Sequence, residues 1–103
     1  MIQLTSQSRI LLAIQPADFR KGIDGLRALC RQQLEKDPME GGLFVFINRS
    51  QTTIRILCYD NNGFWLMSKR LSQGRYRWWP RDQGSVSTIQ AKQLTSLLKG
   101  LVP

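Results

Sequence analysis

The spacing of apolar residues predicts a helix in the first third of the chain. From position 19 onward they recur in steps of three and four, which places them on one helical face: Phe19, Ile23, Leu26, Cys30 and Leu34. We expect this helix to end near Lys36, because Asp37 precedes Pro38 and a residue before proline is disfavoured in the helical region. Gly22 and Gly25 weaken the first turns, so the regular helix is expected only after Gly22.

The middle of the chain has the pattern of an antiparallel sheet. A continuous apolar run at Leu43–Ile47 and two segments rich in β-formers, Thr53–Tyr59 and Phe64–Leu71, predict three strands. The polar residues 48–51 predict the first turn between them. The sequence Asp-Asn-Asn-Gly at 60–63 predicts the second, because Asn-Gly accepts positive φ at both residues and is a strong hairpin signal.

Two shorter segments are further strand candidates. The apolar run Ile10–Ile14 is compatible with a buried strand or the edge of one. The segment Arg75–Trp79 follows a short loop and stops at Pro80, which cannot continue a central strand. We therefore expect an antiparallel meander of about four to five strands.

A second helix is predicted near the C-terminus. Ser87 followed by Gln90 fits a capping box, and the helix is expected from Thr88 to Lys99, with a stop at Gly100. Its apolar stripe consists of Leu94, Leu97, Leu98 and Leu101. With two helices flanking the sheet, the 103 residues predict a single α+β domain spanning positions 1–103.

The chain has a large excess of positive charge. The chain has 15 Lys and Arg against 7 Asp and Glu, for a formal net charge of +8. Ten of the cations are arginines, whose planar guanidinium suits phosphates and base edges. Nucleic acid is the favoured partner class, with an anionic membrane surface second and an ordinary solvated surface as the remaining alternative.

Several classes of protein are excluded or disfavoured by composition. The chain has no histidine, which rules out Ser-His-Asp and Cys-His catalysis and histidine-ligated zinc. No apolar stretch reaches the roughly 18 residues of a membrane span, and the N-terminus lacks a signal-peptide pattern. We expect a cytoplasmic protein with no membrane partner.

Two cysteines and four carboxylates are the candidate metal ligands of the chain. Cys30 and Cys58 lie among apolar residues without a Cys-x-x-Cys spacing, so we expect buried hydrophobic side chains. Four carboxylates could in principle pair around Mg²⁺: Asp18, Asp24, Asp60 and Asp82. Turn chemistry explains Asp60 better, and Asp82 follows Arg81 in a polar loop. We expect no metal, no cofactor and no enzyme activity.

Residues 69–81 are the most informative stretch for function. They contain five basic residues, three aromatic residues and no acid, a mixture that neutralises phosphates and stacks on bases. In a strand, Arg75, Arg77 and Trp79 would share one face, and Tyr76 and Trp78 the other. The alternative places Tyr76 and Trp78 in the core, Trp79 over an edge and the arginines in solvent. We favour core positions for Tyr76 and Trp78 and polyanion contact for the arginines.

A second basic site lies at the start of the first helix. Arg20 and Lys21 precede Gly22, where backbone amides and the helix dipole could receive a phosphate. The alternative is that Asp18 or Asp24 caps the helix and the two cations are ordinary surface residues. From this segment alone, we favour the alternative.

These motifs together resemble one family. The blocks are Asp-Phe-Arg-Lys-Gly-Ile-Asp-Gly-Leu at 18–26, Leu-Phe-Val-Phe at 43–46, Asp-Asn-Asn-Gly-Phe at 60–64, Lys-Arg-Leu at 69–71 with Gly-Arg-Tyr at 74–76, and Trp-Pro at 79–80. Nearly the whole chain resembles the TnpB (Orf2-like) accessory protein of the insertion sequence sixty-six group of bacterial transposons, which is unrelated to the RNA-guided nuclease of the same name. The resemblance implies a small protein that assists a separately encoded transposase. The motif residues by position are Asp18, Arg20, Lys21, Gly22, Asp24, Gly25, Lys69, Arg70, Gly74, Arg75 and Pro80.

Two functional hypotheses follow from the residues and the resemblance. The first is a non-enzymatic accessory factor that binds DNA, at element ends or in the transposase–DNA complex. Its predicted contact residues are Arg20, Lys21, Lys69, Arg70, Arg75, Arg77, Trp79 and Arg81. The second is a module that docks on the transposase without touching DNA, with Trp65, Trp78 or Trp79 as anchors. A third alternative, a metal-dependent nuclease, predicts Mg²⁺-dependent cleavage that Asp60→Ala abolishes, and we expect no such cleavage.

Overall fold

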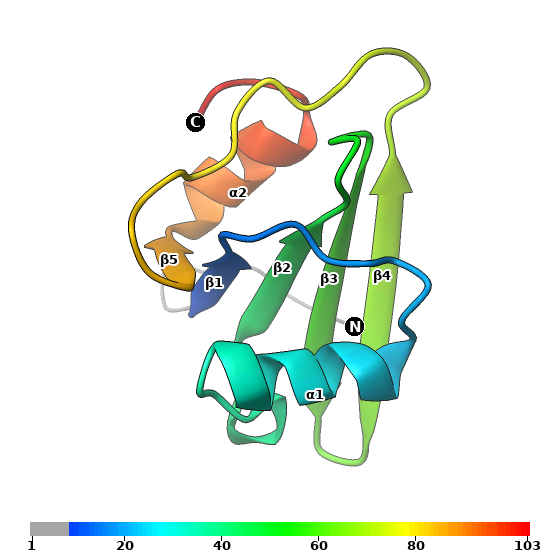
Figure 1. Ribbon diagram of the computed structural model, residues 1–103, viewed down its shortest axis with the longest axis vertical. Helices are drawn as coiled ribbons and strands as arrows, with labels where there is room; N and C mark the ends of the chain where they lie inside the picture. Colours follow the sequence, from blue (N-terminus) through cyan, green and yellow to red (C-terminus); the bar gives the residue numbers. More distant parts are fainter. Residues whose placement is uncertain (1–8) are drawn as a thin grey trace.

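A computed structural model describes residues 9–103 as a five-stranded sheet with one helix on each face (Figure 1). The elements, in chain order, are β1 (Ile10–Ala13), α1 (Ile23–Gln33), the short 3-10 helix η1 (Pro38–Glu40), β2 (Leu43–Ile47), β3 (Thr53–Asp60), β4 (Gly63–Arg70), β5 (Val86–Ile89) and α2 (Ala91–Leu98). The predicted α+β class is confirmed.

The sheet is mixed, so the prediction of a purely antiparallel meander is wrong. The strand order is β4-β3-β2-β1-β5, and β1 runs parallel to β2, with Ile10 opposite Leu43. The chain between these two strands contains α1, and a crossover of this kind returns the chain in its original direction. The predicted meander is confirmed for β2, β3 and β4, which pair antiparallel in sequence order.

Alternation along the strands divides the core into two halves. On one face, Phe44, Phe46 and Leu57 pack with α1, whose predicted stripe supplies the buried Leu26 and Cys30. On the other face, even-numbered β1 residues and odd-numbered β2 residues pack with Leu94 and Leu97 of α2. All five residues of β2 are buried, which explains its continuous apolar run.

The predicted strand at Arg75–Trp79 is wrong. These residues belong to an irregular connection, 71–85, that joins β4 to β5. The backbone N–H of Tyr76 donates to the carbonyl oxygen of Gln51 at 2.8 Å, so a turn, rather than a strand ladder, holds the segment. The fifth strand is Val86–Ile89, in a region whose last two residues were predicted as helix. It pairs antiparallel with β1, which places Ile89 opposite Ile10.

Helix boundaries differ from prediction for local reasons. α1 begins after Gly22, as expected, but ends at Gln33, and Glu35 takes a positive φ of 56°. α2 begins at Ala91 because the capping box consists of Gln90 and Gln93, so the predicted Ser87–Gln90 box is wrong.

The chain leaves α2 and turns between β3 and β4 near the predicted positions. Gly100 has a φ of 82° and donates its N–H to Leu97, which confirms the stop after α2. Leu101 is 56% exposed, so the apolar stripe of α2 ends before it. The β3–β4 hairpin is confirmed, but its turn residues are Asn61 and Asn62, one position earlier than the Asn-Gly signal indicated.

Candidate nucleic-acid interface

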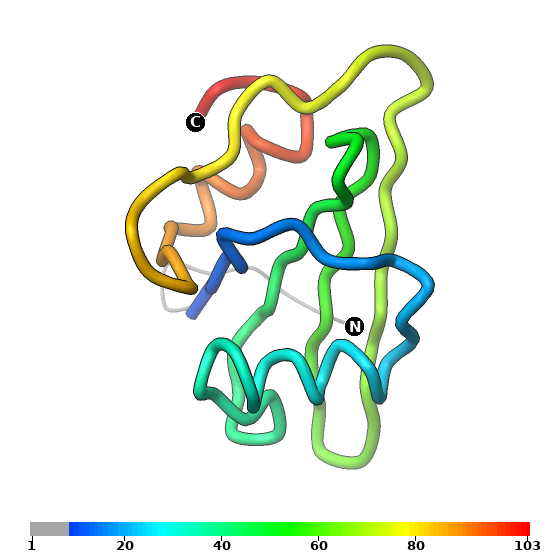
Figure 2. Tube along the Cα trace, viewed as in Figure 1, coloured from blue at the N-terminus to red at the C-terminus, as the bar shows by residue number. Residues whose placement is uncertain are grey.

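Three connections meet at one end of the sheet. The β1–α1 connection (14–22), the β2–β3 turn (48–52) and the β4–β5 connection (71–85) all begin where β1, β2 and β4 end (Figure 2). Backbone hydrogen bonds join them: Ala17 N–H donates to Ile47 at 2.9 Å, Ile14 N–H to Ser85 at 3.1 Å, and Leu71 N–H to Thr52 at 3.0 Å. We call this region the basic end, and its cations are Arg20, Lys21, Arg49, Lys69, Arg70, Arg75, Arg77 and Arg81.

Charge is separated between the two ends of the sheet. The three connections of the basic end contain only two acidic residues, Asp18 and Asp82. Four of the seven acids lie toward the opposite end, around the start of β2 and the end of β3: Glu35, Asp37, Glu40 and Asp60. Four cations lie near them and nearly balance their charge: Arg9, Arg27, Arg31 and Lys36. Such a distribution attracts a polyanion to one end of the molecule.

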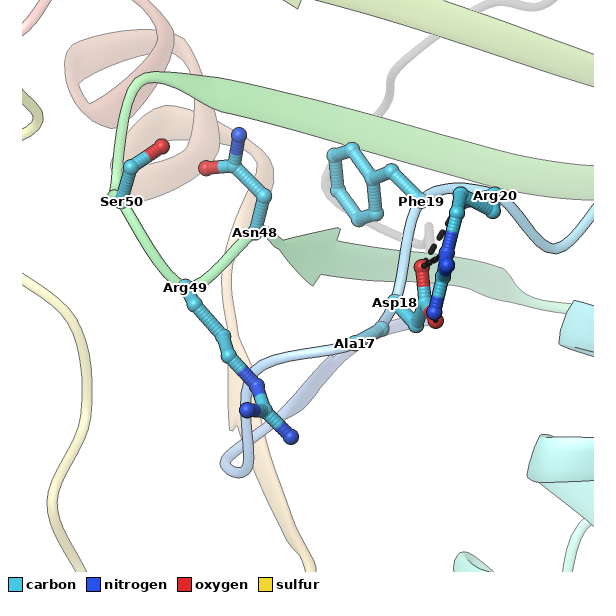
Figure 3. A pocket seen from close by; sticks show the side chains of 7 residues that line it. All are labelled: Ala17, Asp18, Phe19, Arg20, Asn48, Arg49 and Ser50. Atoms are coloured by element: carbon cyan, nitrogen blue, oxygen red, sulfur yellow. Dashed lines mark hydrogen bonds and ion pairs between the residues drawn. The ribbon is translucent and has the colours of Figure 1, made fainter.

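A pocket of about 440 Å³ lies between the first two connections (Figure 3). Arg20 and Asp18 line one side, and Arg49 reaches in from the β2–β3 turn. The turn is held by Asn48, whose Oδ1 accepts the N–H groups of Thr52 at 3.0 Å and Thr53 at 3.2 Å. Sequence reasoning missed Arg49, because it is the single cation of its turn and only the tertiary structure places it at the same pocket as Arg20.

Arg20 already has an anionic partner inside the protein. Its guanidinium lies against the carboxylate of Asp18, with Nη2 to Oδ2 at 2.8 Å, and the Arg20 backbone N–H donates to Oδ1 at 2.9 Å. These hydrogen bonds hold the pKa of Asp18 well below its usual range. The alternative in which Asp18 or Asp24 caps α1 is wrong, since the N-cap is Gly22, which has no side chain to accept a capping hydrogen bond.

Lys69 and Lys21 are held by neighbouring segments. Lys69 Nζ donates to the carbonyl oxygen of Leu98 at 2.6 Å, at the C-terminal end of α2, where a cation is favourable. The Lys21 side chain passes over Gly25, and a Cβ added at Gly25 would lie 2.9 Å from Lys21 Cβ. Gly25 therefore gives Lys21 room against the first turn of α1.

The β4–β5 connection presents the most accessible cations. Arg75 and Arg77 are exposed and line a second pocket, of about 630 Å³, together with Lys99 after α2. Sequence reasoning did not select Lys99, which joins this surface only because α2 packs beside the connection. Within residues 9–103, no internal hydrogen bond or ion pair holds the side chains of Arg49, Arg70, Arg75, Arg77 and Arg81.

The aromatic residues of the connection anchor it to the core. Tyr76 is 1% exposed and Trp79 7% exposed, and Trp78 is half-buried against the same face of the sheet. Core positions for Tyr76 and Trp78 were expected. An exposed face shared by Trp79 with Arg75 and Arg77 is wrong, because no strand forms here and the Trp79 indole turns inward.

Arg55 fixes the β1–α1 connection to the sheet. Its Nη1 donates to the carbonyl oxygen of Phe19 at 2.7 Å, and its guanidinium carbon lies 4.7 Å from the centre of the Phe19 ring. Both contacts hold the backbone immediately before Arg20. Arg55 therefore positions the Arg20 side of the pocket, a role that its place within a β-rich segment did not indicate.

The cysteines and remaining carboxylates have structural surroundings. Cys30 is buried, and burial raises the pKa of its thiol to about 12. Cys58 is half-buried, and its pKa is also raised by desolvation. Asp60 accepts a hydrogen bond from Trp65 Nε1 at 2.6 Å. Within residues 9–103, no three His, Cys, Asp or Glu side chains form a group suited to a metal ion.

Neither helix of the described chain is long and apolar enough to cross a membrane. The fold and its cationic end define a small basic α+β domain. The chain belongs to the IS66 Orf2-like protein family, whose model matches residues 8–103. The resemblance of the motif blocks is thus confirmed. Membership of this family indicates a transposition-associated accessory protein. The family is not a known class of enzyme.

Two relatives from Sinorhizobium fredii (strain NBRC 101917 / NGR234) are similar to most of the chain. The uncharacterized protein y4hO is 34% identical over 93 residues, which covers 90% of this chain and 80% of that protein. The uncharacterized protein y4jC is 34% identical over 93 residues, with 90% and 79% covered. No solved structure matches the chain.

Proposed function

We propose that this protein assists transposition by binding DNA through the basic end. The observation that supports the proposal is the separation of charge, which places eight of the fifteen cations around three adjoining connections. Phosphate neutralisation by such a surface gives sequence-independent affinity. The surface thus fits an accessory factor that holds DNA for a separately encoded transposase.

The arginines without internal partners are the strongest contact residues. Arg75, Arg77 and Arg81 project from a connection in which the rings of Tyr76 and Trp79 are buried, so their backbone is held in place before DNA arrives. Arg49 and Arg70 flank them on the neighbouring turn and strand end. Arginine can donate to a phosphate through two N–H groups at once, which favours it over lysine at such sites.

Arg20, Lys21 and Lys69 have a secondary part in the proposal. Arg20 must exchange its contact with Asp18 for a phosphate, and Lys69 must leave the carbonyl oxygen of Leu98. Both exchanges reduce the net binding free energy that a new phosphate contact contributes. Trp79 is not included as a stacking residue, because its ring is buried.

A salt titration tests the proposal. Labelled duplexes of element-end and random sequence are titrated with the full chain, and the dissociation constant is measured at a series of salt concentrations. If about five phosphates are neutralised, log K falls with log salt at a slope near −4.5. A chain that shows no affinity for either duplex, even at low salt, contradicts the proposal.

The second hypothesis is docking on the transposase without DNA contact. Of its three anchors, Trp79 is buried and Trp78 half-buried, whereas Trp65 is 45% exposed. Co-purification with the transposase after nuclease treatment separates the two hypotheses. An association that survives nuclease, combined with no duplex binding, supports docking; an association that is lost with the DNA supports the DNA-binding proposal.

A further inference from the structure

The strand β4 forms an open edge of the sheet. It is the outermost strand next to β3 and has eight residues, whereas the opposite edge strand, β5, has four (Figure 1). Its pairing with β3 is continuous, from Thr53 opposite Arg70 to Asp60 opposite Gly63, without a bulge. Within residues 9–103, no strand pairs with the outer side of β4, so its backbone N–H and C=O groups are unpaired there.

The usual devices that protect an edge strand are missing from most of β4. Soluble proteins interrupt exposed edges with charges, proline, bulges or covering segments. Residues 63–68 include neither a charged residue nor proline. The two cations of the strand, Lys69 and Arg70, lie at its last two positions.

One face of β4 also carries two large apolar side chains that are partly exposed. Trp65 lies opposite Cys58 and Met67 opposite Ile56, on the sheet face that α2 covers farther along the sheet. The side chains remain 45% and 37% exposed, respectively. Large apolar residues exposed side by side on an open edge are typical of an interaction surface.

We propose that β4 pairs antiparallel with β4 of a second copy of this chain, about a two-fold axis at Met67. A two-fold axis requires a surface that is complementary to itself. In this register, Lys69 lies opposite the partner's Trp65 on one face, and Arg70 lies opposite the partner's Phe64 on the other. Lys69, on leaving the carbonyl oxygen of Leu98, is thus placed against the indole of the partner's Trp65. The Phe64 ring already has the guanidinium carbon of Arg27 5.6 Å from its centre, so the Lys69 pair is the stronger of the two.

The charge pattern of β4 selects this arrangement over the parallel one. In a parallel pair, Lys69 and Arg70 of the two copies would be neighbours and repel each other. In the antiparallel pair, the two Lys69 positions are four residues apart along the strand, about 14 Å. That separation exceeds the Debye length of about 8 Å at physiological salt, so their repulsion is largely screened.

The dimer has a consequence that rests on the proposed DNA binding. Antiparallel β4 strands direct the basic ends of the two copies toward opposite ends of the joined ten-stranded sheet. One dimer can then hold two separate duplexes. We infer that the protein bridges DNA segments.

Sedimentation and a charge substitution test the dimer without DNA. At about 100 µM, where a dimer of micromolar affinity is mostly assembled, the chain is expected at twice its 11.9 kDa monomer mass. Met67→Lys places two like charges opposite each other on the axis and is expected to give monomers with an unchanged circular dichroism spectrum. The matched control is Val102→Lys, at a residue 63% exposed and outside β4, which is expected to remain dimeric.

A monomeric wild-type chain, or a dimer that persists in Met67→Lys, would overturn the proposal. If the wild-type chain is monomeric by itself but forms a complex when the transposase is added, β4 pairs with a strand of the transposase instead, and the proposed dimer is wrong.

Disulfide trapping tests the register, including the case in which Met67→Lys does not fold. Met67→Cys is expected to form a covalent dimer under oxidising conditions, because the two residues lie opposite each other on the axis. Ser68→Cys is expected to form little covalent dimer, since the two copies of residue 68 are offset by two residues along the strand. The wild-type chain controls for Cys30 and Cys58. Equal trapping at both positions contradicts the Met67 register.

A bridging assay separates this inference from the proposed function. The wild-type chain is expected to retain a labelled duplex on beads that hold a second, unlabelled duplex, and Met67→Lys is expected to bind single duplexes without retaining the label. If neither chain binds a duplex but the wild type is dimeric, the DNA-binding proposal is contradicted and the dimer proposal is supported. If the wild type and Met67→Lys retain the labelled duplex equally, the β4 dimer does not bridge DNA, and the bridging inference is contradicted.

Discussion

The indole Nε1 of Trp79 donates a hydrogen bond of 3.0 Å to the carbonyl oxygen of Ala13, 66 residues earlier in the chain. Ala13 is the last residue of β1, and Trp79 lies within the irregular connection before β5. The bond fixes the basic connection to the C-terminal end of β1. Together with buried Tyr76, it determines where Arg75, Arg77 and Arg81 project.

Trp79→Phe is expected to lower stability measurably. The substitution retains a ring but leaves the buried Ala13 carbonyl without its donor, at a cost of about 1–3 kcal/mol. For a domain of this size, each kcal/mol lowers Tm by roughly 4–8 °C. Thermal unfolding followed by circular dichroism measures the loss. Trp78→Phe is the control, since its ring is half-buried and its indole has no hydrogen-bond partner within residues 9–103; equal losses would contradict the assigned role of the bond.

Replacing Arg75 and Arg77 together with Ala is expected to weaken DNA binding across all sequences. Two lost phosphate contacts reduce the steepness of the salt dependence by about 1.8. The control is the double variant Arg31→Ala/Lys36→Ala, which removes the same charge from exposed positions at the end of α1 and beyond. Fluorescence anisotropy measures both slopes. If both double variants reduce the slope equally, net charge, and not the basic end, governs binding.

Asp18→Asn is expected to strengthen DNA binding. The amide retains an oxygen that accepts the Arg20 backbone N–H, but it removes the charge that holds the Arg20 guanidinium. Freed Arg20 can then take a phosphate, which makes the salt slope steeper by about 0.9. Glu40→Gln makes the same charge change at the opposite end and is expected to leave the slope unchanged. An Asp18→Asn slope identical to the wild type would contradict the prediction that the Asp18 carboxylate keeps Arg20 from a phosphate.

Stability is expected to fall in alkaline solution because of Cys30. Burial raises the pKa of its thiol from 9.0 to about 12, so the folded chain keeps a proton that the unfolded chain releases. The contribution is fully present below about pH 9 and is lost as pH rises toward 12, by at most about 1.4 kcal/mol per pH unit. Urea unfolding of the wild type and Cys30→Ala across this range compares the two slopes. A wild-type slope no steeper than that of the variant contradicts this assignment.

Local patterns in the sequence were sufficient for the elements whose stabilising contacts are near in the chain. The stripe of α1 and the β2–β3–β4 meander follow from residue spacing and from turns of two to five residues, which act within one short segment. The positive charge of residues 69–81 and of Arg20-Lys21 was equally visible, because charge depends only on residue type.

Contacts between distant segments decided the rest. A short apolar run such as β1 does not specify its direction, and β5 becomes a strand only because β1 offers a pairing edge. Trp79 turned inward because Ala13 presents a carbonyl oxygen there, and Arg49 joined Arg20 because β2 ends beside the β1–α1 connection.

The sequence by itself therefore determined the amount of positive charge, the two amphipathic helices and the central hairpins, since each depends on residues close together in the chain. Only the tertiary structure decided that the cations gather at one end, that an aromatic residue of the basic stretch is buried and that β4 remains an open edge. The physical reason is that strand order and backbone pairing depend on which of all the segments pair most favourably with one another. The sequence of a single segment does not contain that information.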